Sequence, residues 1–219
     1  MKSLSMGGGG ESLPNVFYTV DENKVYFNPL VYTIEYNSTD GKIVEPYSTS
    51  RMPFLDTDGK NIEILSNTYE NGKGIIKLQK ECYQIGRHAF QDCKTLSSIT
   101  IPNSVTSINY FAFSGCTSLT GITTPDSLTS IGNSAFFYCI SLAKITIPNK
   151  VTSIEIGAFK GCTSLSNITV LPETPPTLED YVFNGIASNA VIYVPSDSVN
   201  AYKSATNWSD YADIIEAIS

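Results

Sequence analysis

The residues of this sequence that could do chemistry are five cysteines, one histidine and a few pairs of carboxylates. Four of the cysteines recur every 23 residues, at Cys93, Cys116, Cys139 and Cys162. A zinc site needs ligands in close pairs such as Cys-x-x-Cys. If each 23-residue copy forms one coil of a stack, the four cysteines are spread along the stack and cannot surround one ion. Neighbouring copies come within disulfide range by distance, but their parallel side chains point the same way. We therefore expect reduced, buried thiols that act as small apolar groups, and no bound metal.

The other polar groups do not form a recognisable catalytic set. A triad needs a nucleophile, a base and an orienting acid, and the sequence contains no Gly-x-Ser-x-Gly, no His-Glu-x-x-His and no glycine-rich phosphate loop. His88 stands at a variable position, where we expect an exposed turn. The pairs Asp56 with Asp58 and Glu179 with Asp180 lie in Gly- or Pro-rich segments, as solvated turns do, whereas a glycosidase needs them in a cleft. The sequence predicts no enzyme and no cofactor.

The 23-residue spacing also holds for other residue types. It relates the phenylalanines, leucines and isoleucines of four successive copies, namely Phe90, Phe113, Phe136 and Phe159, Leu96, Leu119, Leu142 and Leu165, and Ile99, Ile122, Ile145 and Ile168. A fixed period of this length with Leu-x-x-Ile-x-Ile inside it is typical of a leucine-rich repeat solenoid. The predicted fold class is therefore mainly β, with short strands and short 3-10 or helical turns.

Each copy begins with a short strand. In the first copy Leu96, Ile99 and Ile101 face the core, whereas Ser98 and Thr100 point outward. The proline that follows ends the strand because it cannot donate to a ladder.

The rest of each copy returns along the opposite wall. Residues 105–108 are a second extended piece, rich in β-branched side chains. Ala112, Phe113 and Cys116 then have spacings that suit one turn of α- or 3-10 helix. A large buried side chain contributes about 1.5 to 3 kcal/mol, but ordering each residue costs about 1 to 2 kcal/mol. A single coil is therefore unstable, and stacking is required.

The register continues into a degenerate coil at each end. Before the first full copy it predicts a rung made of Ile76, Leu78, Cys82 and Ile85, with Cys82 at a valine position. After the last copy, with one inserted residue, it predicts a rung made of Phe183, Ile186, Ile192 and Val194.

The repeat segments, which include "IPNSVTSI", "CTSL" and "GAFKGC", resemble the BspA-like leucine-rich repeat family, which occurs in surface proteins of Bacteroidales and other host-associated microbes. The resemblance covers residues 74–170 and extends to the flanking "STDGKIVEPY" and "IYVPSDSVNAYKSATNWSDYADII". It implies adhesion to host extracellular-matrix proteins or to other bacteria, and an extracellular or cell-surface location.

Three residues depart from the repeat pattern. Thr124 stands where the first copy has Ile101, so we expect the third rung to be the weakest. Glu155 stands where two other copies have glycine, which puts the geometry of its turn in question. Tyr138 also replaces a glycine of two other copies.

The segments outside the repeats predict two caps. Residues 1–12 contain four glycines and no apolar core of a signal peptide, so we expect a flexible leader or a remnant of recombinant expression. Residues 13–73 are expected to form a β-rich cap, or an independent domain, with hairpins in "NVFYTVDENKVYFN" and "VYTIEYNSTDGKIVEPY".

Residues 74–172 hold the degenerate first rung and four full repeats, and residues 173–219 hold the last degenerate repeat and a C-terminal cap. In this cap we expect a strand over 191–194 and a helix from Ser196 or Asp197 to about Thr206, with Ser or Asp as its N-cap.

The charge pattern narrows the class of partner. The net charge is −7, and no cluster of Lys and Arg offers a site for nucleic acid. No stretch of about 18 apolar residues predicts a transmembrane helix. The oligomeric state stays open.

Two groups of outward residues are candidates for ligand binding. The first follows the strands: Ser98, Thr100, Thr123, Lys144, Thr146, Asn167 and Thr169. The second is aromatic: Tyr110, Phe111, Phe137 and Tyr138. Threonine columns also stabilise stacked strands without any ligand, and the aromatic residues either pack between coils or form an exposed contact patch.

These observations leave two functional hypotheses. The first is a non-enzymatic binding or adhesion module of a cell-surface or secreted protein, which presents a solenoid face to a host protein, a glycan or another cell. The alternative is a passive structural spacer or scaffold without a dedicated ligand.

Overall fold

The computed structural model describes residues 17–21, 24–28, 32–46 and 53–218. The chain divides into two units, residues 1–31 and 32–219. In the first, β1 (Phe17–Asp21) and β2 (Lys24–Asn28) pair antiparallel, with Asp21 opposite Lys24. This confirms the first predicted hairpin, whereas the predicted leader lies outside the described residues.

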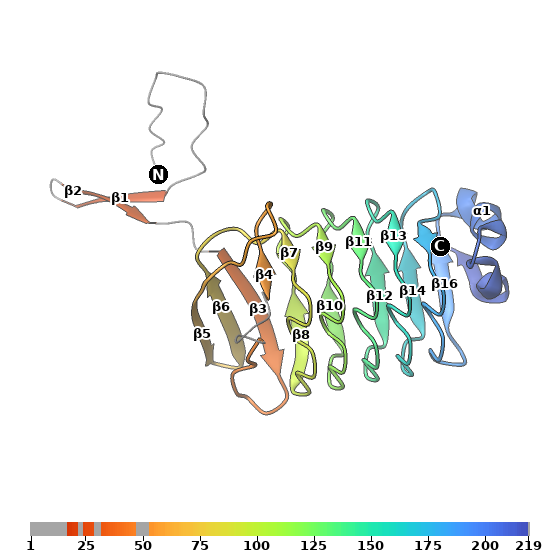
Figure 1. Cartoon of the computed structure of the whole chain (residues 1–219), viewed down its shortest axis with the longest axis horizontal. Helices are drawn as coiled ribbons and strands as arrows, with labels where there is room; N and C mark the ends of the chain where they lie inside the picture. Colours follow the sequence, from red (N-terminus) through yellow and green to blue (C-terminus); the bar gives the residue numbers. More distant parts are fainter. Residues whose placement is uncertain (1–16, 22–23, 29–31, 47–52, 219) are drawn as a thin grey trace, which may run out of the picture. The chain divides into compact units, whose positions relative to one another are not determined.

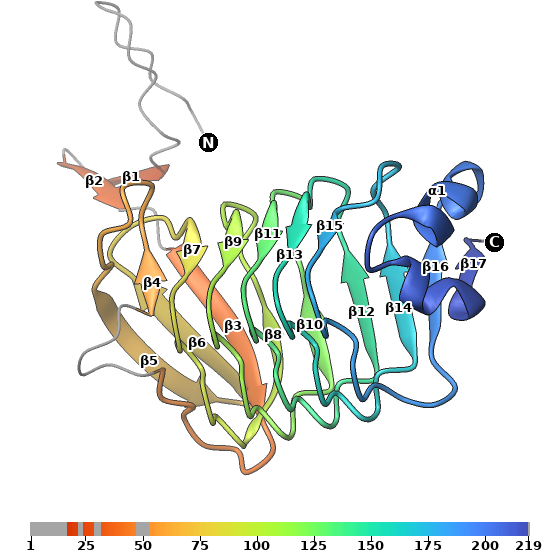
Figure 2. The same ribbon diagram turned by 45° about the vertical axis from the view of Figure 1, so that its right-hand side comes forward.

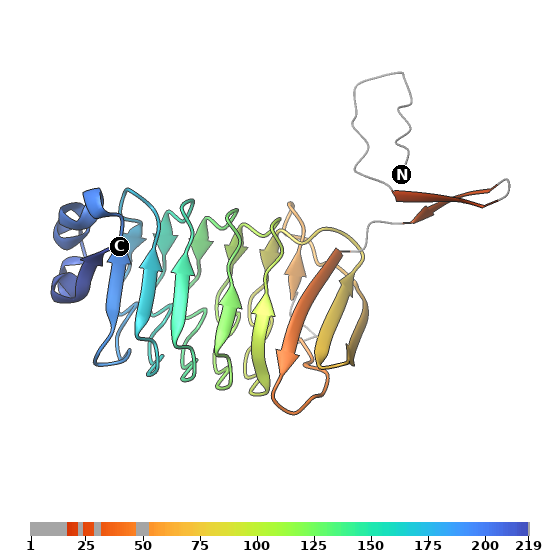
Figure 3. The ribbon, with the colours of Figure 1, turned by 180° about the vertical axis from the view of Figure 1, so that it is seen from behind.

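The second unit is a solenoid with two walls of strands (Figures 1 and 2). The long-strand wall, seen in Figure 3, contains β8 (Leu96–Thr100), β10 (Gly121–Thr123), β12 (Lys144–Ile147), β14 (Asn167–Val170) and β16 (Val191–Val194). The short-strand wall contains β7 (Gln84–Ile85), β9 (Ser107–Ile108), β11 (Ser130–Ile131), β13 (Ser153–Ile154) and β15 (Thr177–Leu178). Each coil contributes one strand to each wall.

The predicted register is confirmed by the strand pairing. Ile99 lies beside Ile122 in the parallel pair β8 and β10, and Ile145 lies beside Ile168 in the pair β12 and β14. On the short-strand wall Ile108 lies beside Ile131. Because partners in a parallel ladder are one repeat apart, each column of the sequence becomes a column in space.

The core is organised around a stack of phenylalanine rings. The rings of Phe90, Phe113, Phe136, Phe159 and Phe183 follow one another with centroid distances of 5.2, 5.3, 5.2 and 5.6 Å and nearly parallel planes. Their side chains are almost fully buried. Such ring pairs contribute roughly 0.5 to 1.5 kcal/mol beyond the area that they bury, so the stack stabilises every coil through its neighbours.

The expected turn of helix in each repeat is a chain of single turns instead. Cys116 N–H donates to Phe113 O at 3.1 Å, as in a 3-10 turn, but Phe113 N–H donates to Ala135 O of the next coil at 2.7 Å. Phe111 and Gly115 have positive φ angles, 54° and 73°. Left-handed residues interrupt a helix, and the freed N–H groups bond between coils.

The N-terminal cap corrects two predictions. It is built from β3 (Tyr32–Ser38), β4 (Phe54–Leu55), β5 (Ile64–Glu70) and β6 (Lys73–Leu78). The second predicted hairpin is wrong, because β3 lies between β6 and β8 and is antiparallel to both.

The four residues of the degenerate first rung are buried as predicted, but the rung stacks directly on the first full copy on one wall only. On the short-strand wall Ile85 pairs with Ile108, as predicted. On the long-strand wall Ile76 pairs with Ile34 of β3, and Tyr36 of β3 takes the place beside Ile99. The buried Tyr36 hydroxyl donates to Asn67 Oδ1 at 2.8 Å and accepts from Val44 N–H at 3.2 Å, which fixes the inserted strand.

The long-strand wall is divided between β10 and β12, whereas the short-strand wall is one continuous sheet from β4 to β15. Thr124 leaves the third rung without the apolar residue that Ile101 supplies in the first copy. Ile122 is only half-buried, whereas Ile99 and Ile145 are each 2% exposed. The third rung is therefore the weak one, as predicted.

Glu155 does not disturb its turn. Its N–H donates to Ile131 O at 2.9 Å, just as Gly132 N–H donates to Ile108 O at 2.7 Å. Its carboxylate accepts a hydrogen bond from Asn133 N–H at 2.9 Å. The turn therefore keeps its backbone hydrogen bond, and the carboxylate adds another one to the neighbouring coil.

The C-terminal cap contains the predicted strand β16 and a shorter helix than predicted. A 3-10 helix (Ser196–Ser198) leads into α1 (Val199–Ser204), and no side chain caps either N-terminus. A serine, Ser198, does stand at the N-cap of α1, two residues after the predicted start, but its side chain makes no capping hydrogen bond.

The last part of the cap was not predicted. A second 3-10 helix (Ser209–Ile214) precedes β17 (Ile215–Ala217), which adds to the sheet beside β16. Tyr202 and Trp208 are fully buried and donate to the carbonyls of Pro172 and Pro176 at 2.7 and 2.8 Å. The degenerate repeat is confirmed, because Phe183, Ile192 and Val194 are buried and Ile186 is half-buried against the core.

We predict that Phe136→Ala lowers the free energy of unfolding by about 3 to 5 kcal/mol, because it leaves a cavity inside the ring stack. Phe137→Ala is the matched control, since this neighbouring ring is only half-buried, and it should cost clearly less. Urea unfolding followed by circular dichroism measures both. Equal losses would contradict the role of the stack.

Candidate functional site

The predicted threonine column runs across the outer surface of the long-strand wall. Thr100 lies beside Thr123, and Thr146 lies beside Thr169. The column continues into both caps, to Glu35 on β3 and Tyr193 on β16. Sequence analysis missed these two residues because β3 and the inserted residue before β16 fall outside the 23-residue period.

A second column lies next to it. Gly121 lies beside Ser98, and Asn167 lies beside Lys144. Ser98 Oγ is hydrogen-bonded to the Asn37 amide at 3.0 Å, so its hydroxyl already has a structural partner. Lys144 and Asn167 are exposed.

The break between β10 and β12 brings five predicted residues together in one hollow of about 320 Å³. It is lined by three residues from each of three strands: 98–100, 121–123 and 144–146. A second hollow of about 240 Å³ is lined by residues 122–124 together with Asp126, Thr146, Pro148 and Leu171. We call the two together the break groove, since they share Ile122, Thr123 and Thr146. Asn167 and Thr169 lie outside it.

The aromatic candidates form a row of contacting rings. His88 stacks on Phe111 with a centroid distance of 5.6 Å, Phe111 meets Phe137 at 6.2 Å, and Phe137 meets Tyr138 at 4.4 Å. The rings of Tyr110, Phe111 and Phe137 are half-buried, but Tyr138 is 52% exposed. Three of the four candidates therefore pack between coils. His88 lies in a turn, as predicted, but is half-buried and not exposed.

The cysteine column is a structural feature of the core. Cys116, Cys139 and Cys162 are buried free thiols, and each donates to a phenylalanine carbonyl of the preceding coil at 3.0 to 3.1 Å. Burial raises the pKa of the Cys82 and Cys93 thiols to about 12 and holds that of Cys139 well above its usual range. Thiols in this state are poor nucleophiles. Cys93 departs from the prediction, because it is half-buried.

The part of the chain that the structure describes holds no group of three His, Cys, Asp or Glu side chains that could bind a metal ion. It also holds no helix that is long and apolar enough to cross a membrane.

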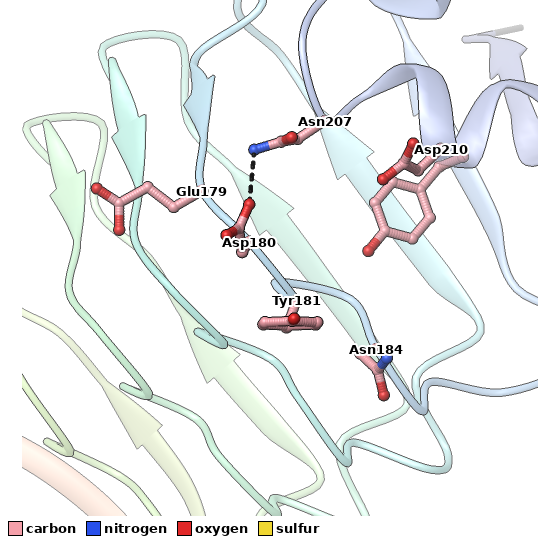
Figure 4. A pocket seen from close by; sticks show the side chains of 7 residues that line it. Glu179, Asp180, Tyr181, Asn184, Asn207 and Asp210 are labelled. Atoms are coloured by element: carbon pink, nitrogen blue, oxygen red, sulfur yellow. Dashed lines mark hydrogen bonds between the residues drawn. The ribbon is translucent and has the colours of Figure 1, made fainter.

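A hollow that sequence analysis missed lies between the last turn and the C-terminal cap. It has a volume of about 420 Å³ and is lined by Glu179, Asp180, Tyr181, Asn184, Asn207, Asp210 and Tyr211 (Figure 4). Asn207 Nδ2 donates to Leu178 O at 2.7 Å and to Asp180 Oδ1 at 3.4 Å. Glu179 accepts from Ile156 N–H at 2.9 Å.

Sequence analysis placed Glu179 and Asp180 in a solvated turn, and both are exposed. It did not predict that residues 207–211 fold back over them. The sequence feature that could have indicated this acidic hollow is the excess of acidic residues after residue 172.

Coils of 23 residues, with one strand on each wall and a column of buried leucine, isoleucine and phenylalanine, define a leucine-rich repeat solenoid. Residues 62–209 match the BspA type leucine rich repeat region, in six copies. The chain belongs to this family.

Solved structures of bacterial repeat proteins resemble the chain. A leucine-rich repeat protein of T. pallidum is 30% identical, with 53% of each chain covered and a TM-score of 0.48. The match thus spans about half the length of that protein. A leucine-rich repeat protein from Bacteroides capillosus is 25% identical, with 57% of this chain and 98% of that chain covered and a TM-score of 0.41.

The pneumococcal vaccine antigen PcpA is 18% identical, with 63% of this chain and 38% of that chain covered and a TM-score of 0.46. A comparison with curated proteins gives no match.

We predict that alkaline pH destabilises the fold through the buried thiols. A folded-state pKa of about 12 for Cys82 lies above the value of about 8.5 for an unfolded cysteine. The raised pKa therefore contributes stability that is fully present below pH 8.5 and is lost as the pH rises toward 12. Melting temperatures between pH 7 and 9.5 measure this loss.

The matched variant is Cys82→Val, which installs the residue that Val105 represents in the next coil. Its melting temperature should fall less steeply with pH than that of the wild type. Identical slopes would show that the thiol does not titrate with unfolding.

Proposed function

We propose that the chain is a non-enzymatic binding module of a cell-surface or secreted protein, and that the long-strand wall is its binding face. The partner is a host protein, a glycan or a neighbouring cell. The observation that carries the proposal is the break groove, which gathers five outward polar residues that the repeat pattern singles out. Membership of the BspA-type family supports this role.

The threonine hydroxyls of the outward column differ in their hydrogen bonds from the threonine hydroxyls that link neighbouring coils. On the short-strand side, Thr106 Oγ1 donates to Tyr83 O at 3.2 Å, and Thr129 Oγ1 donates to Thr106 O at 2.9 Å. These hydroxyls stabilise the stack. Among the described residues, by contrast, the hydroxyls of Thr100, Thr123 and Thr146 have no partner.

This difference favours binding over a purely structural role for the long-strand wall. Threonines that link the coils use their hydroxyls in the same way on both walls, since Thr120 Oγ1, just before β10, donates to Ser97 O at 3.1 Å. The outward column on the long-strand wall does not. The exposed hydroxyls on the long-strand wall keep their full capacity to donate and accept, which is what a polar ligand needs.

We predict that changes to the wall weaken binding without unfolding the protein. Soluble wild-type chain is tested on immobilised extracellular-matrix proteins, on a glycan array and on whole bacterial and host cells. The double variant Thr123→Arg with Lys144→Ala should bind at least tenfold more weakly to whichever target the wild type binds, because the long side chain blocks the wall and the positive charge moves from β12 to β10.

Lys150→Ala is the matched control, since Lys150 is an exposed lysine of the same coil outside the groove. Tyr138→Ser tests the exposed aromatic residue in the same assays. The passive spacer would be the better description if the wild type bound none of these targets, or if the wall variant bound as the wild type does.

A further inference from the structure

The sequence departs from its own repeat at two positions beside the break groove. Gly121 stands where the other copies have Ser98, Lys144 and Asn167. Glycine weakens a strand because it has no side chain to pack and a larger entropy to lose. Thr124 stands where the neighbouring coil has the fully buried Ile147. Both changes act against the fold: Gly121 begins β10, and Thr124 directly follows its last residue.

The consequence is a local loss of pairing. In the coils on either side, Thr120 N–H donates to Ser97 O at 2.9 Å, and Ser166 N–H donates to Ala143 O at 3.0 Å. Across the break the described residues form no backbone hydrogen bond of this kind. The Thr124 hydroxyl donates to Thr146 O at 2.7 Å instead.

The rest of the stack does not open at this point. On the short-strand wall Thr129 N–H donates to Thr106 O at 2.8 Å, and in the turns Phe113 N–H donates to Ala135 O at 2.7 Å. The rings of Phe113 and Phe136 remain 5.3 Å apart. The disruption is therefore confined to the wall that we propose as the binding face, and the rest of the coil keeps its contacts with its neighbours.

The chemistry of the groove favours one class of occupant. The strands β10 and β12 remain too close together to admit another strand between them. Backbone N–H and C=O groups that do not pair across the break can still bond the main chain of an extended segment that lies along the outer surface of the groove. The lining consists of hydroxyls and aliphatic side chains and contains no aromatic ring on which a sugar would stack. Exposed Lys144 lines one hollow and exposed Asp126 the other. Opposite charges at separate places select a ligand with both charges, in one orientation.

We propose that the break groove binds an extended segment of a partner polypeptide, with an acidic side chain near Lys144 and a basic side chain near Asp126. This inference rests on the proposed function, since it specifies the ligand of the same wall. It also explains the two unfavourable residues, because a sequence departs from its local rules most often where function requires it.

The first experiment restores the repeat residues at the break, so that β10 can pair with β12. The double variant Gly121→Ser with Thr124→Ile restores the residues of the first copy, Ser98 and Ile101. The probe is a phage-displayed library of nine-residue peptides, selected on the full-length wild-type chain. We expect the repaired variant to melt several degrees higher and to bind the selected peptides at least tenfold more weakly. Ser134→Gly, which relieves a positive φ of 53° outside the groove, is the control and should bind like the wild type.

A charge reversal tests the orientation without relying on the repair. Lys144→Glu combined with Asp126→Lys should bind the original peptides weakly and should select peptides with the reversed order of charges. Unaltered selection would overturn the proposal, as would a repaired variant that binds peptides like the wild type, or a wild type that selects none.

The outcomes also separate this inference from the proposed function. Loss of glycan-array binding in the repaired variant, with no peptide selected, would identify a glycan as the occupant and overturn the polypeptide. If Thr123→Arg with Lys144→Ala lost target binding but the repaired variant did not, the wall would still be the binding face. The proposal that the break groove binds the ligand would be overturned.

Discussion

The contact between one coil and the next is the constraint on which the rest of the structure depends. Phenylalanine rings stack at 5.2 to 5.3 Å through the four full repeats, close to the spacing of about 4.8 Å between neighbouring strands. Ring stacking and strand pairing therefore require the same rise per coil, and a repeat of constant length satisfies both. Because each coil contacts only its neighbours, the ends need different partners. Phe54 and Trp208 contact the first and last rings of the stack, and strands from the caps add to the sheets at each end.

Much of the fold could be predicted because the period assigns each column one environment. The inward Ile99, the buried Cys116 and the pairing of Ile85 with Ile108 all follow from position within the repeat. The insertion of β3 could not, because an antiparallel pairing between Tyr36 and Ile99 links segments that share no period. The left-handed turns were also missed. Phe111, with φ of 54°, has no glycine to signal its conformation, and the hydrogen bonds that hold it come from the next coil.

The candidate site was predictable in part for the same reason. The alternation along a strand identifies Thr100 and Thr123 as outward residues, and the substitution at Thr124 identifies the weak rung. The hollow itself was not predictable, because it arises from hydrogen bonds that are absent between β10 and β12. The acidic hollow beside Asn207 depends on a 3-10 helix after α1, whose position is set by burial of Trp208.

A repeat protein has a particular way of acquiring a binding site. If every coil were identical, every position along a wall would be equivalent, and no ligand would have a unique location. A local departure creates one place that differs from the others, and the redundancy of the stack limits its cost. Here the phenylalanine stack, the hydrogen bonds between the turns and the short-strand wall are all continuous through the third rung. Only the long-strand wall loses its pairing. The loss of Ile at position 124 thus removes stability from one surface only. That surface carries Thr100, Thr123 and Thr146, whose hydroxyls are unpaired among the described residues.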